Sequence, residues 1–217
     1  MRAQREGCYP DVPFRWDVLT RRGADLSPVM LFNEVRGMLI GLSGLPGVGK
    51  TTIARELCRA TGAVHLRADS IEQALRNAGW KVESEGYLVA YAVAADNLIV
   101  GRMVVADCVD PWPLTRREWR SVAERAGVQF LSVAVVCSDA EEHRRRVELR
   151  VADITGHTLP TWADVLERDY RLRDDERLVV DTARLDVAAS VRLIRSVLDT
   201  QRGGSLHHAD RDQDSHK

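Results

Sequence analysis

The chain has 217 residues, of which 45% are hydrophobic and 29% are charged, and its formal net charge is −1. This length and composition are typical of one globular domain with a substantial core. The near-zero charge supplies no overall field that attracts nucleic acid or an anionic membrane, and no apolar stretch is long and uncharged enough to span a bilayer. Nucleic-acid binding is therefore disfavoured, and no membrane association is expected. The four dispersed cysteines form no metal-spaced pair and favour reduced thiols and a cytoplasmic location.

The two ends of the chain are expected to lie outside the folded domain. Residues 1–36 lack strong periodicity and predict an N-terminal extension that is only partly ordered or packs on the domain surface. Residues 201–217 are polar and predict a disordered tail. Residues 37–200 are therefore expected to form the domain. Metal binding by the histidines of the tail is the alternative to a solvated tail; these are His207, His208 and His216.

A short apolar run, residues 38–43, leads directly into a glycine-rich loop, residues 44–51. The run is typical of a buried parallel strand. The loop has the pattern Gly, four residues, Gly, Lys and Ser or Thr, whose backbone N–H groups cradle nucleotide phosphates. Lys50 adds a positive charge at the β- and γ-phosphates, and the Thr51 hydroxyl is a ligand for Mg²⁺. The residues expected to bind the nucleotide are Gly44, Leu45, Pro46, Gly47, Val48, Gly49, Lys50, Thr51 and Thr52.

The residues after the loop supply the context that this motif requires. Residues 52–61 have apolar side chains at helical spacing, and Gly62 is a suitable helix stop. The N-terminus of a helix favours anions, so strand, loop and helix in this order support a phosphate site. A glycine-rich turn without a ligand is the alternative.

From residue 63 onward, apolar strands alternate with helical patterns. The expected strands are residues 63–68, 103–106, 130–136 and 178–180. The expected helices are one that starts near Ser70, residues 86–100, 115–126 and 139–150, and a last one capped by Asp186. This alternation predicts a parallel, doubly wound α/β sheet with its ligand site at the carboxyl ends of the strands.

Carboxylates follow two of the expected strands directly. Asp69 comes after the second strand, which places it beside the phosphate loop as a candidate base for an acceptor hydroxyl. Capping of the helix near Ser70 is the alternative role for Asp69. Asp107 ends the third strand and is a candidate ligand for Mg²⁺, directly or through water, with a turn cap as the alternative.

The residues after Asp107 are candidates for the acceptor side of the site. Asp110 lies just beyond the strand, and Trp112 stands between two prolines in a stiff segment suited to shaping a pocket. Core packing is the alternative for the Trp112 ring. Arg120, on the following helix, is a third candidate contact for the acceptor.

A basic run on the helix expected at residues 139–150 predicts a lid over residues 143–160. Arg146 and Arg150 lie four residues apart, and therefore on one helix face, with Arg145 as a reserve. Planar guanidinium groups suit phosphate oxygens and can neutralise charge on a transferring phosphoryl group. Gly156 falls in the flexible part of the expected lid. A solvated helix whose arginines pair with neighbouring glutamates is the alternative.

Together these segments resemble the small bacterial P-loop kinases of the "predicted kinase" AAA type, which are related to polynucleotide kinases, adenylylsulfate kinases, chloramphenicol phosphotransferase and zeta toxins. The resemblance covers residues 38–198. It rests on the loop at 44–52, on Leu66-Arg67-Ala68-Asp69-Ser70-Ile71, on Val104-Val105-Ala106-Asp107, on Arg146-Val147-Glu148-Leu149-Arg150 and on Val179-Val180-Asp181-Thr182.

The resemblance implies a three-layer P-loop sandwich with a five-stranded parallel sheet in the order 2-3-1-4-5 and a helical lid. It also implies that Asp69 is the base, that Asp107 lies in the metal and substrate region, that Arg146 and Arg150 belong to the lid, and that the segment after Asp181 lies near the adenine. The third strand departs from its relatives, because it continues Asp107-Cys108-Val109-Asp110-Pro111-Trp112. No relative's acceptor is therefore transferred to this chain.

The expected function is an ATP- and Mg²⁺-dependent kinase that moves the γ-phosphoryl group to a hydroxyl of a small-molecule or nucleotide-like acceptor. The expected catalytic residues are Asp69, Lys50, Arg146 and Arg150, with Thr51 and Asp107 at the metal. Three alternatives remain open: a regulatory ATPase without a small acceptor, a zeta-toxin-like kinase and a polynucleotide kinase. The chain is expected to be a monomer or a homodimer.

Overall fold

The computed structural model describes residues 37–110, 112–170 and 178–204. The extension expected at 1–36 lies outside this part of the chain. Of the disordered tail expected at 201–217, residues 201–204 instead continue a helix, and residues 205–217 lie outside the described part. The described residues form five parallel strands in the order β2-β3-β1-β4-β5, as the resemblance predicts. The strands are β1 (Met38–Ser43), β2 (Val64–Arg67), β3 (Met103–Asp107), β4 (Gln129–Val136) and β5 (Leu178–Asp181).

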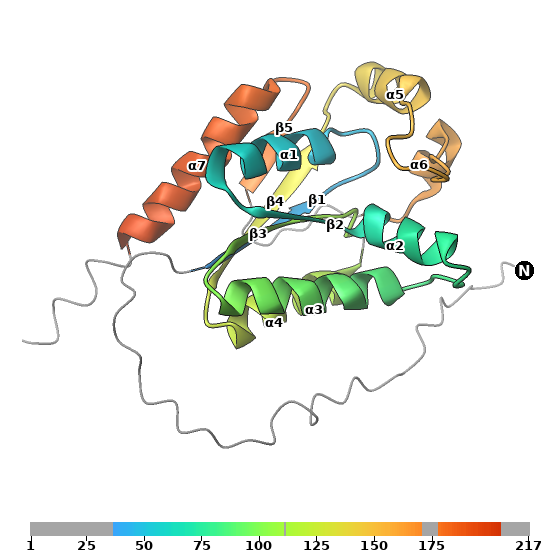
Figure 1. Ribbon diagram of the computed structural model, residues 1–217. Coiled ribbons are helices and arrows are strands. Elements are labelled where there is room, and N and C mark those ends of the chain that lie inside the picture. The colour runs from blue at the N-terminus through green and yellow to red at the C-terminus, as the bar shows by residue number, and fades with distance from the viewer. Residues whose placement is uncertain (1–36, 111, 171–177, 205–217) are drawn as a thin grey trace, which may run out of the picture. The chain divides into compact units, whose positions relative to one another are not determined.

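Helices cover both faces of this sheet and make the fold a three-layer sandwich (Figure 1). On one face lie α1 (Lys50–Thr61) and α7 (Val187–Gly204), and on the other lie α3 (Glu85–Ile99) and α4 (Pro113–Arg125). The remaining helices, α2 (Ala68–Asn77), α5 (Ala140–Leu149) and α6 (Trp162–Glu167), gather at one end of the sheet. α6 was not predicted from the sequence.

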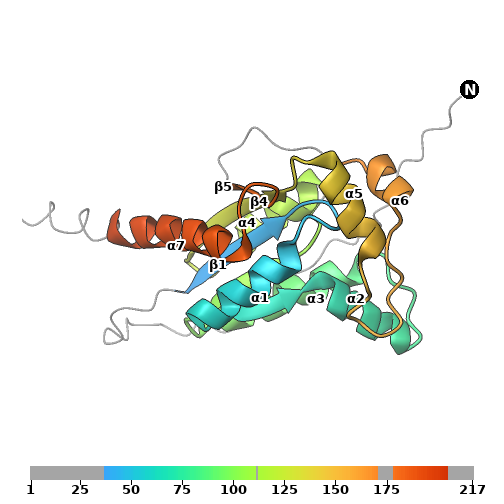
Figure 2. The same cartoon turned by 90° about the horizontal axis from the view of Figure 1, so that it is seen from above.

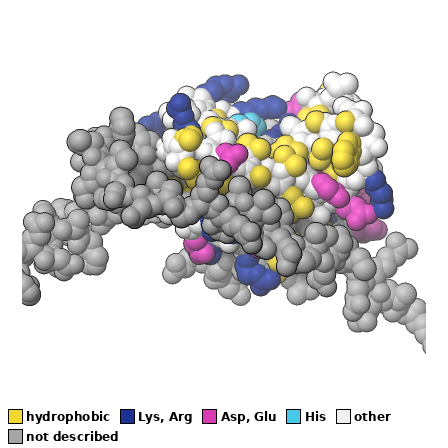
Figure 3. Space-filling model, turned by 60° about the horizontal axis from the view of Figure 1, so that its bottom comes forward, with side chains coloured by type: hydrophobic (Ala, Val, Ile, Leu, Met, Phe, Trp, Pro, Cys, Tyr) yellow, Lys and Arg dark blue, Asp and Glu magenta, His cyan; other side chains and the backbone are white. Residues whose placement is uncertain are grey.

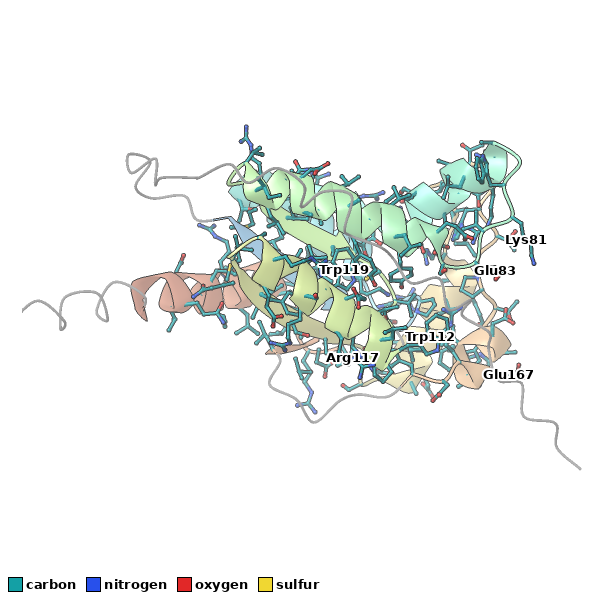
Figure 4. The ribbon with its side chains drawn as sticks, turned by 90° about the horizontal axis from the view of Figure 1, so that it is seen from below. Lys81, Glu83, Trp112, Arg117, Trp119 and Glu167 are labelled. Atoms are coloured by element: carbon teal, nitrogen blue, oxygen red, sulfur yellow. The ribbon has the colours of Figure 1, made fainter. Side chains whose placement is uncertain are left out.

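Each face of the sheet has its own hydrophobic core. Side chains of β1 and β4 pack with Ile53 and Leu57 of α1 and with Ile194 of α7. On the other face, Trp119 of α4 is 1% exposed and meets the Tyr91 ring of α3 edge-on, with 4.6 Å between ring centroids. Figure 4 shows Trp119 between the two helices, whereas Arg117 of α4 points away from them. Because the strands are buried on both faces, they read as nearly continuous apolar runs.

The outer face of α3 retains hydrophobic side chains. Leu88, Val89 and Val93 are 38–46% exposed, and Figure 3 shows hydrophobic side chains interspersed with charged ones on the side of the molecule where α3 and α4 lie. The α3 sequence is therefore apolar on its exposed face as well as on its buried face. None of the helices that the structure describes combines the length and the apolar character needed to cross a bilayer.

The sequence predicted the start of α7 correctly but not the start of α2. Asp186 caps α7 as predicted, because its Oδ1 accepts a hydrogen bond of 2.6 Å from the backbone N–H of Ala189. α2 starts two residues earlier than expected, with Arg67 as its N-cap. Asp69 therefore lies in the first turn of α2 and does not cap a helix near Ser70.

Candidate active site

The glycine-rich loop joins β1 to α1 at the carboxyl edge of the sheet and depends on glycines at fixed positions. Gly44, Gly47 and Gly49 have φ values of +149°, +84° and +97°, a range that side chains disfavour. A Cβ on Gly44 would lie 2.3 Å from the carbonyl oxygen of Val135, and a Cβ on Gly47 would lie 2.5 Å from Cγ2 of Val147. The loop is therefore wrapped tightly between β4 and α5.

Gly44→Ala is expected to lower the free energy of unfolding by about 1–3 kcal/mol, because the backbone is strained for alanine and the new Cβ meets a rigid carbonyl. For a domain of this size, each kcal/mol corresponds to a loss of about 2–4 °C in melting temperature. Thermal denaturation measures the loss. Gly62→Ala is the matched control, since Gly62 also has a positive φ (+70°) but no atom lies within 4 Å of its Cβ position. Equal losses in the two variants would contradict the close packing around Gly44.

Lys50, the first residue of α1, lies folded against the loop. Its side chain is only 8% exposed, and Nζ donates hydrogen bonds of 2.8 Å to the carbonyl oxygens of Gly44 and Leu45. Burial lowers the pKa of the Lys50 ammonium group, although the charges of Asp107 and Asp69 act in the opposite direction. An ammonium group has three donors, so two fix the side chain on the loop and the third remains for an anion in the cleft.

Asp107 ends β3 beside this lysine and is 3% exposed. Its Oδ2 lies 3.2 Å from Nε2 of His65 on β2. Burial would raise the pKa of this carboxyl, but the hydrogen bond from His65, the Lys50 charge and a hydrogen bond from the Thr51 hydroxyl outweigh it and hold the pKa below its ordinary value. An ionised carboxylate next to a threonine hydroxyl at a phosphate loop is the donor set that Mg²⁺ takes from a protein. Thr51 and Asp107 therefore fit the expected metal site.

Asp69 follows β2, which is separated from the loop strand β1 by β3 alone. It lines the same cleft, with its side chain 36% exposed. Its Oδ2 lies 3.7 Å from Nη2 of Arg67. Arg67 itself is 5% exposed and forms a bidentate pair with Asp153, with N···O distances of 2.8 and 3.1 Å. Asp153 belongs to the segment after α5, so this pair connects the expected lid to the sheet.

The lid expected at residues 143–160 covers most of α5 and the segment after it, and α6 follows directly. Figure 2 shows α5 and α6 with α2 at the end of the sheet toward which β1 points. Nε2 of the buried His143 donates a hydrogen bond of 2.8 Å to the carbonyl oxygen of Pro46, and its ring meets Trp162 edge-on at 5.1 Å. The lid is thus packed directly on the phosphate loop.

The two lid arginines differ in their contacts. Arg146 donates to Glu142 and, through Nη1 and Nη2, to the hydroxyl and carbonyl oxygens of Thr182 at 2.8 and 3.1 Å. Arg150 forms no hydrogen bond or ion pair with the part of the chain that is described, and its charge lies close enough to Lys50 to affect the pKa of that residue. Arg145 pairs with Glu142, as the alternative of a solvated helix predicts.

These elements surround one cleft of about 1220 Å³, which exceeds the roughly 300–1,000 Å³ of most small-molecule sites. Asp69, Asp107, Arg146 and Arg150 line it together with most of the loop, namely Pro46, Gly47, Gly49, Lys50, Thr51 and Thr52. Gly44, Leu45 and Val48 of the loop are not among its lining residues. Polar residues that the sequence did not single out line it as well; they are Arg55, Glu72, Gln73, Arg76, Asp153, His157 and Thr158.

The three residues expected on the acceptor side are not among those that line the cleft. Asp110 is buried with a φ of +51°, and its backbone N–H donates to the Tyr87 hydroxyl at 3.2 Å. Trp112 is 47% exposed at the start of α4 (Figure 4). The Arg120 guanidinium lies 5.6 Å from the centre of the Phe130 ring, near the amino end of β4. The sequence placed these residues near the site because they follow β3, but the chain turns away after Val109.

Comparison with known proteins agrees with this architecture. A family model described as "AAA domain" matches residues 39–169. A protein of Aeropyrum pernix named "Probable adenylyl-sulfate kinase" is 26% identical over 171 residues, which cover 75% of this chain and 93% of that protein. Among solved structures, the APS kinase of Mycobacterium tuberculosis in complex with AMPPNP and APS superposes with a TM-score of 0.60 at 19% identity, over 76% of this chain and 99% of that one. A gluconokinase from Sinorhizobium meliloti gives a TM-score of 0.52 at 17% identity, over 77% and 98% of the two chains. The chain belongs to this AAA-domain family and has the P-loop kinase fold.

Proposed function

We propose that the protein is a phosphotransferase that uses ATP and Mg²⁺ to phosphorylate a hydroxyl group of a small-molecule or nucleotide-like acceptor. The observation that carries this proposal is the shared cleft: the phosphate loop after β1 and the Asp69 carboxylate after β2 line one cavity, and only β3 lies between these two strands. The volume of the cleft also suits two substrates.

Each residue has a defined part in this proposal. The loop N–H groups and the third Lys50 donor bind the phosphates. Thr51 would hold Mg²⁺ together with Asp107, which would bind the ion directly or through water. The ion would neutralise negative charge on the β- and γ-phosphates. The guanidinium of Arg150, which pairs with no group among the described residues, is suited to the transferring phosphoryl group, whereas Arg146 holds Thr182 near the expected adenine position.

The chemical step follows from these positions. The acceptor hydroxyl gives its proton to the Asp69 carboxylate as its oxygen forms a bond to the γ-phosphorus. The bond between that phosphorus and the β,γ-bridging oxygen breaks, and ADP leaves with the electron pair. Lys50 stays close to both the β- and γ-phosphates and so favours the charge that moves onto the leaving group.

Transfer from γ-labelled ATP tests the proposal. The wild-type protein is incubated with Mg²⁺ and with separate pools of sugars and sugar acids, nucleosides, adenylyl sulfate and an oligonucleotide that carries a 5′-hydroxyl group. We expect label in one small-molecule or nucleoside pool at a rate well above hydrolysis. Label only in inorganic phosphate, with every pool present, would favour the regulatory ATPase. Label in the oligonucleotide would favour a polynucleotide kinase.

A further inference from the structure

Arg67 is a buried cation that has two carboxylates within reach. It ends β2, and its Nη1 and Nη2 atoms donate to the two oxygens of Asp153 at 2.8 and 3.1 Å. The oxygen of Asp69 lies 3.7 Å from the same Nη2, beyond hydrogen-bond distance. The planar fork of the guanidinium therefore faces Asp153, and Asp69 interacts with Arg67 only through the longer electrostatic contact.

Asp153 is held by cations from two different elements of the core. Besides Arg67, Nη2 of Arg55 on α1 donates to its Oδ2 at 2.5 Å. The hydrogen bond from Arg67, together with Arg55, holds the pKa of the Asp153 carboxyl well below its usual range, although burial acts in the opposite direction. The lid thus brings an ionised carboxylate to the one buried guanidinium that is adjacent to Asp69.

The alternative partner for Arg67 is the proposed base. A buried guanidinium that loses its carboxylate is strongly destabilised, so it moves toward the nearest remaining anion. Asp69 is two residues away on the start of α2 and is already in contact at 3.7 Å. A hydrogen bond from Arg67 would occupy a carboxylate oxygen of Asp69 and stabilise its ionised form, which makes it a poorer proton acceptor.

We propose that Asp153 is a positioning residue, which keeps Arg67 from donating a hydrogen bond to Asp69 and so leaves the Asp69 carboxylate available to the acceptor hydroxyl. The inference rests on the proposed phosphotransferase function. It also couples the lid to the reaction: when the lid lies on the core, Arg67 donates its hydrogen bonds to Asp153, and Asp69 accepts none from Arg67.

Asp153→Asn tests this role, because it removes the charge and keeps the size of the side chain. We expect kcat for phosphoryl transfer to fall by about 10-fold to 10²-fold with the KM for ATP unchanged, since the phosphate loop does not contact Asp153. Arg55→Gln is the matched control. It removes the other cation that binds Asp153 but leaves Arg67 in its place, so a smaller loss of kcat is expected.

A second-site change separates this role from simple anchoring of the lid. In the double variant Asp153→Asn with Arg67→Gln, no guanidinium remains to capture Asp69, so kcat is expected to recover toward the wild-type value. If Asp153 only anchors the lid, the double variant will be at least as impaired as the single one. A wild-type kcat for Asp153→Asn, or no recovery in the double variant, would overturn the inference.

A structural measurement keeps the inference testable apart from activity. A crystal structure of Asp153→Asn is expected to show Arg67 within hydrogen-bond distance of Asp69. A structure in which Arg67 stays clear of Asp69 would overturn the inference even if transfer is lost. If instead the wild-type protein transfers no phosphoryl group to any acceptor, the proposed function fails, and the Arg67 position in the variant still decides whether Asp153 separates the two side chains.

Discussion

Lys50→Ala is expected to reduce phosphoryl transfer by about 10²–10³-fold, the usual cost of removing one preorganised donor from a developing negative charge. The effect is large because the ammonium group is buried and fixed, with two of its donors on the carbonyl oxygens of Gly44 and Leu45. It therefore meets the phosphates without reorganisation, and no other lysine lines the cleft in the part of the chain that the structure describes. Steady-state kinetics with saturating ATP and acceptor measure the loss.

The matched control for this substitution is Lys81→Ala. Lys81 lies in the segment between α2 and α3, next to Glu83 and outside the cleft, with its side chain 87% exposed (Figure 4). This variant is expected to keep wild-type kinetics. Thermal denaturation of both variants shows whether the Lys50 change also loosens the loop. A folded Lys50→Ala protein with wild-type transfer would show that the reaction does not use this ammonium group.

Asp69→Asn is expected to lower kcat by about 10²–10⁴-fold, the range for loss of a positioned general base. The amide keeps the shape of the carboxylate but cannot take a proton from the acceptor hydroxyl. ATP affinity is expected to remain, because the phosphates are bound by the loop and by Lys50. Calorimetry of ATP binding and acceptor-saturated kinetics together separate the two effects.

Glu83→Gln is the control for charge alone, since Glu83 is an exposed carboxylate in the segment between α2 and α3 and does not line the cleft. Its kinetics are expected to match those of the wild type. If Asp69→Asn transferred phosphate at the wild-type rate, the assignment of Asp69 as the base would be wrong. A loss of ATP binding in Asp69→Asn would instead assign Asp69 to the nucleotide.

The fold was largely predictable because its elements are encoded locally. β1 spans the predicted 38–43, and the glycine pattern that follows specifies one loop geometry. The order of the strands came from the resemblance, since alternation alone predicts a parallel sheet without fixing which strands are neighbours. α6 was missed because six residues are too few for a periodic pattern, although the Thr161–Asp164 capping box marks its start.

The candidate site was predictable where a side chain follows a strand directly and, for Arg146 and Arg150, where helical spacing places two arginines on one face. Parallel strands bring the residues after their carboxyl ends together, which is why the loop, Asp69 and Asp107 share a cleft. Asp110, Trp112 and Arg120 lie further along the chain, where the path of the backbone after Val109 decides their position. Asp153 is 84 or more residues from Arg67 and Asp69, and its pairing with Arg67 depends on how the lid folds back, which no local pattern specifies.

Calorimetric titration of the wild-type protein with ATP, with and without Mg²⁺, tests most directly whether the loop at residues 44–51 binds a nucleotide polyphosphate. We predict saturable binding with a dissociation constant of about 1 μM–1 mM, the usual range for enzyme substrates, and clearly weaker binding when Mg²⁺ is removed. A folded protein that binds no nucleoside triphosphate in the presence of Mg²⁺ would contradict the account.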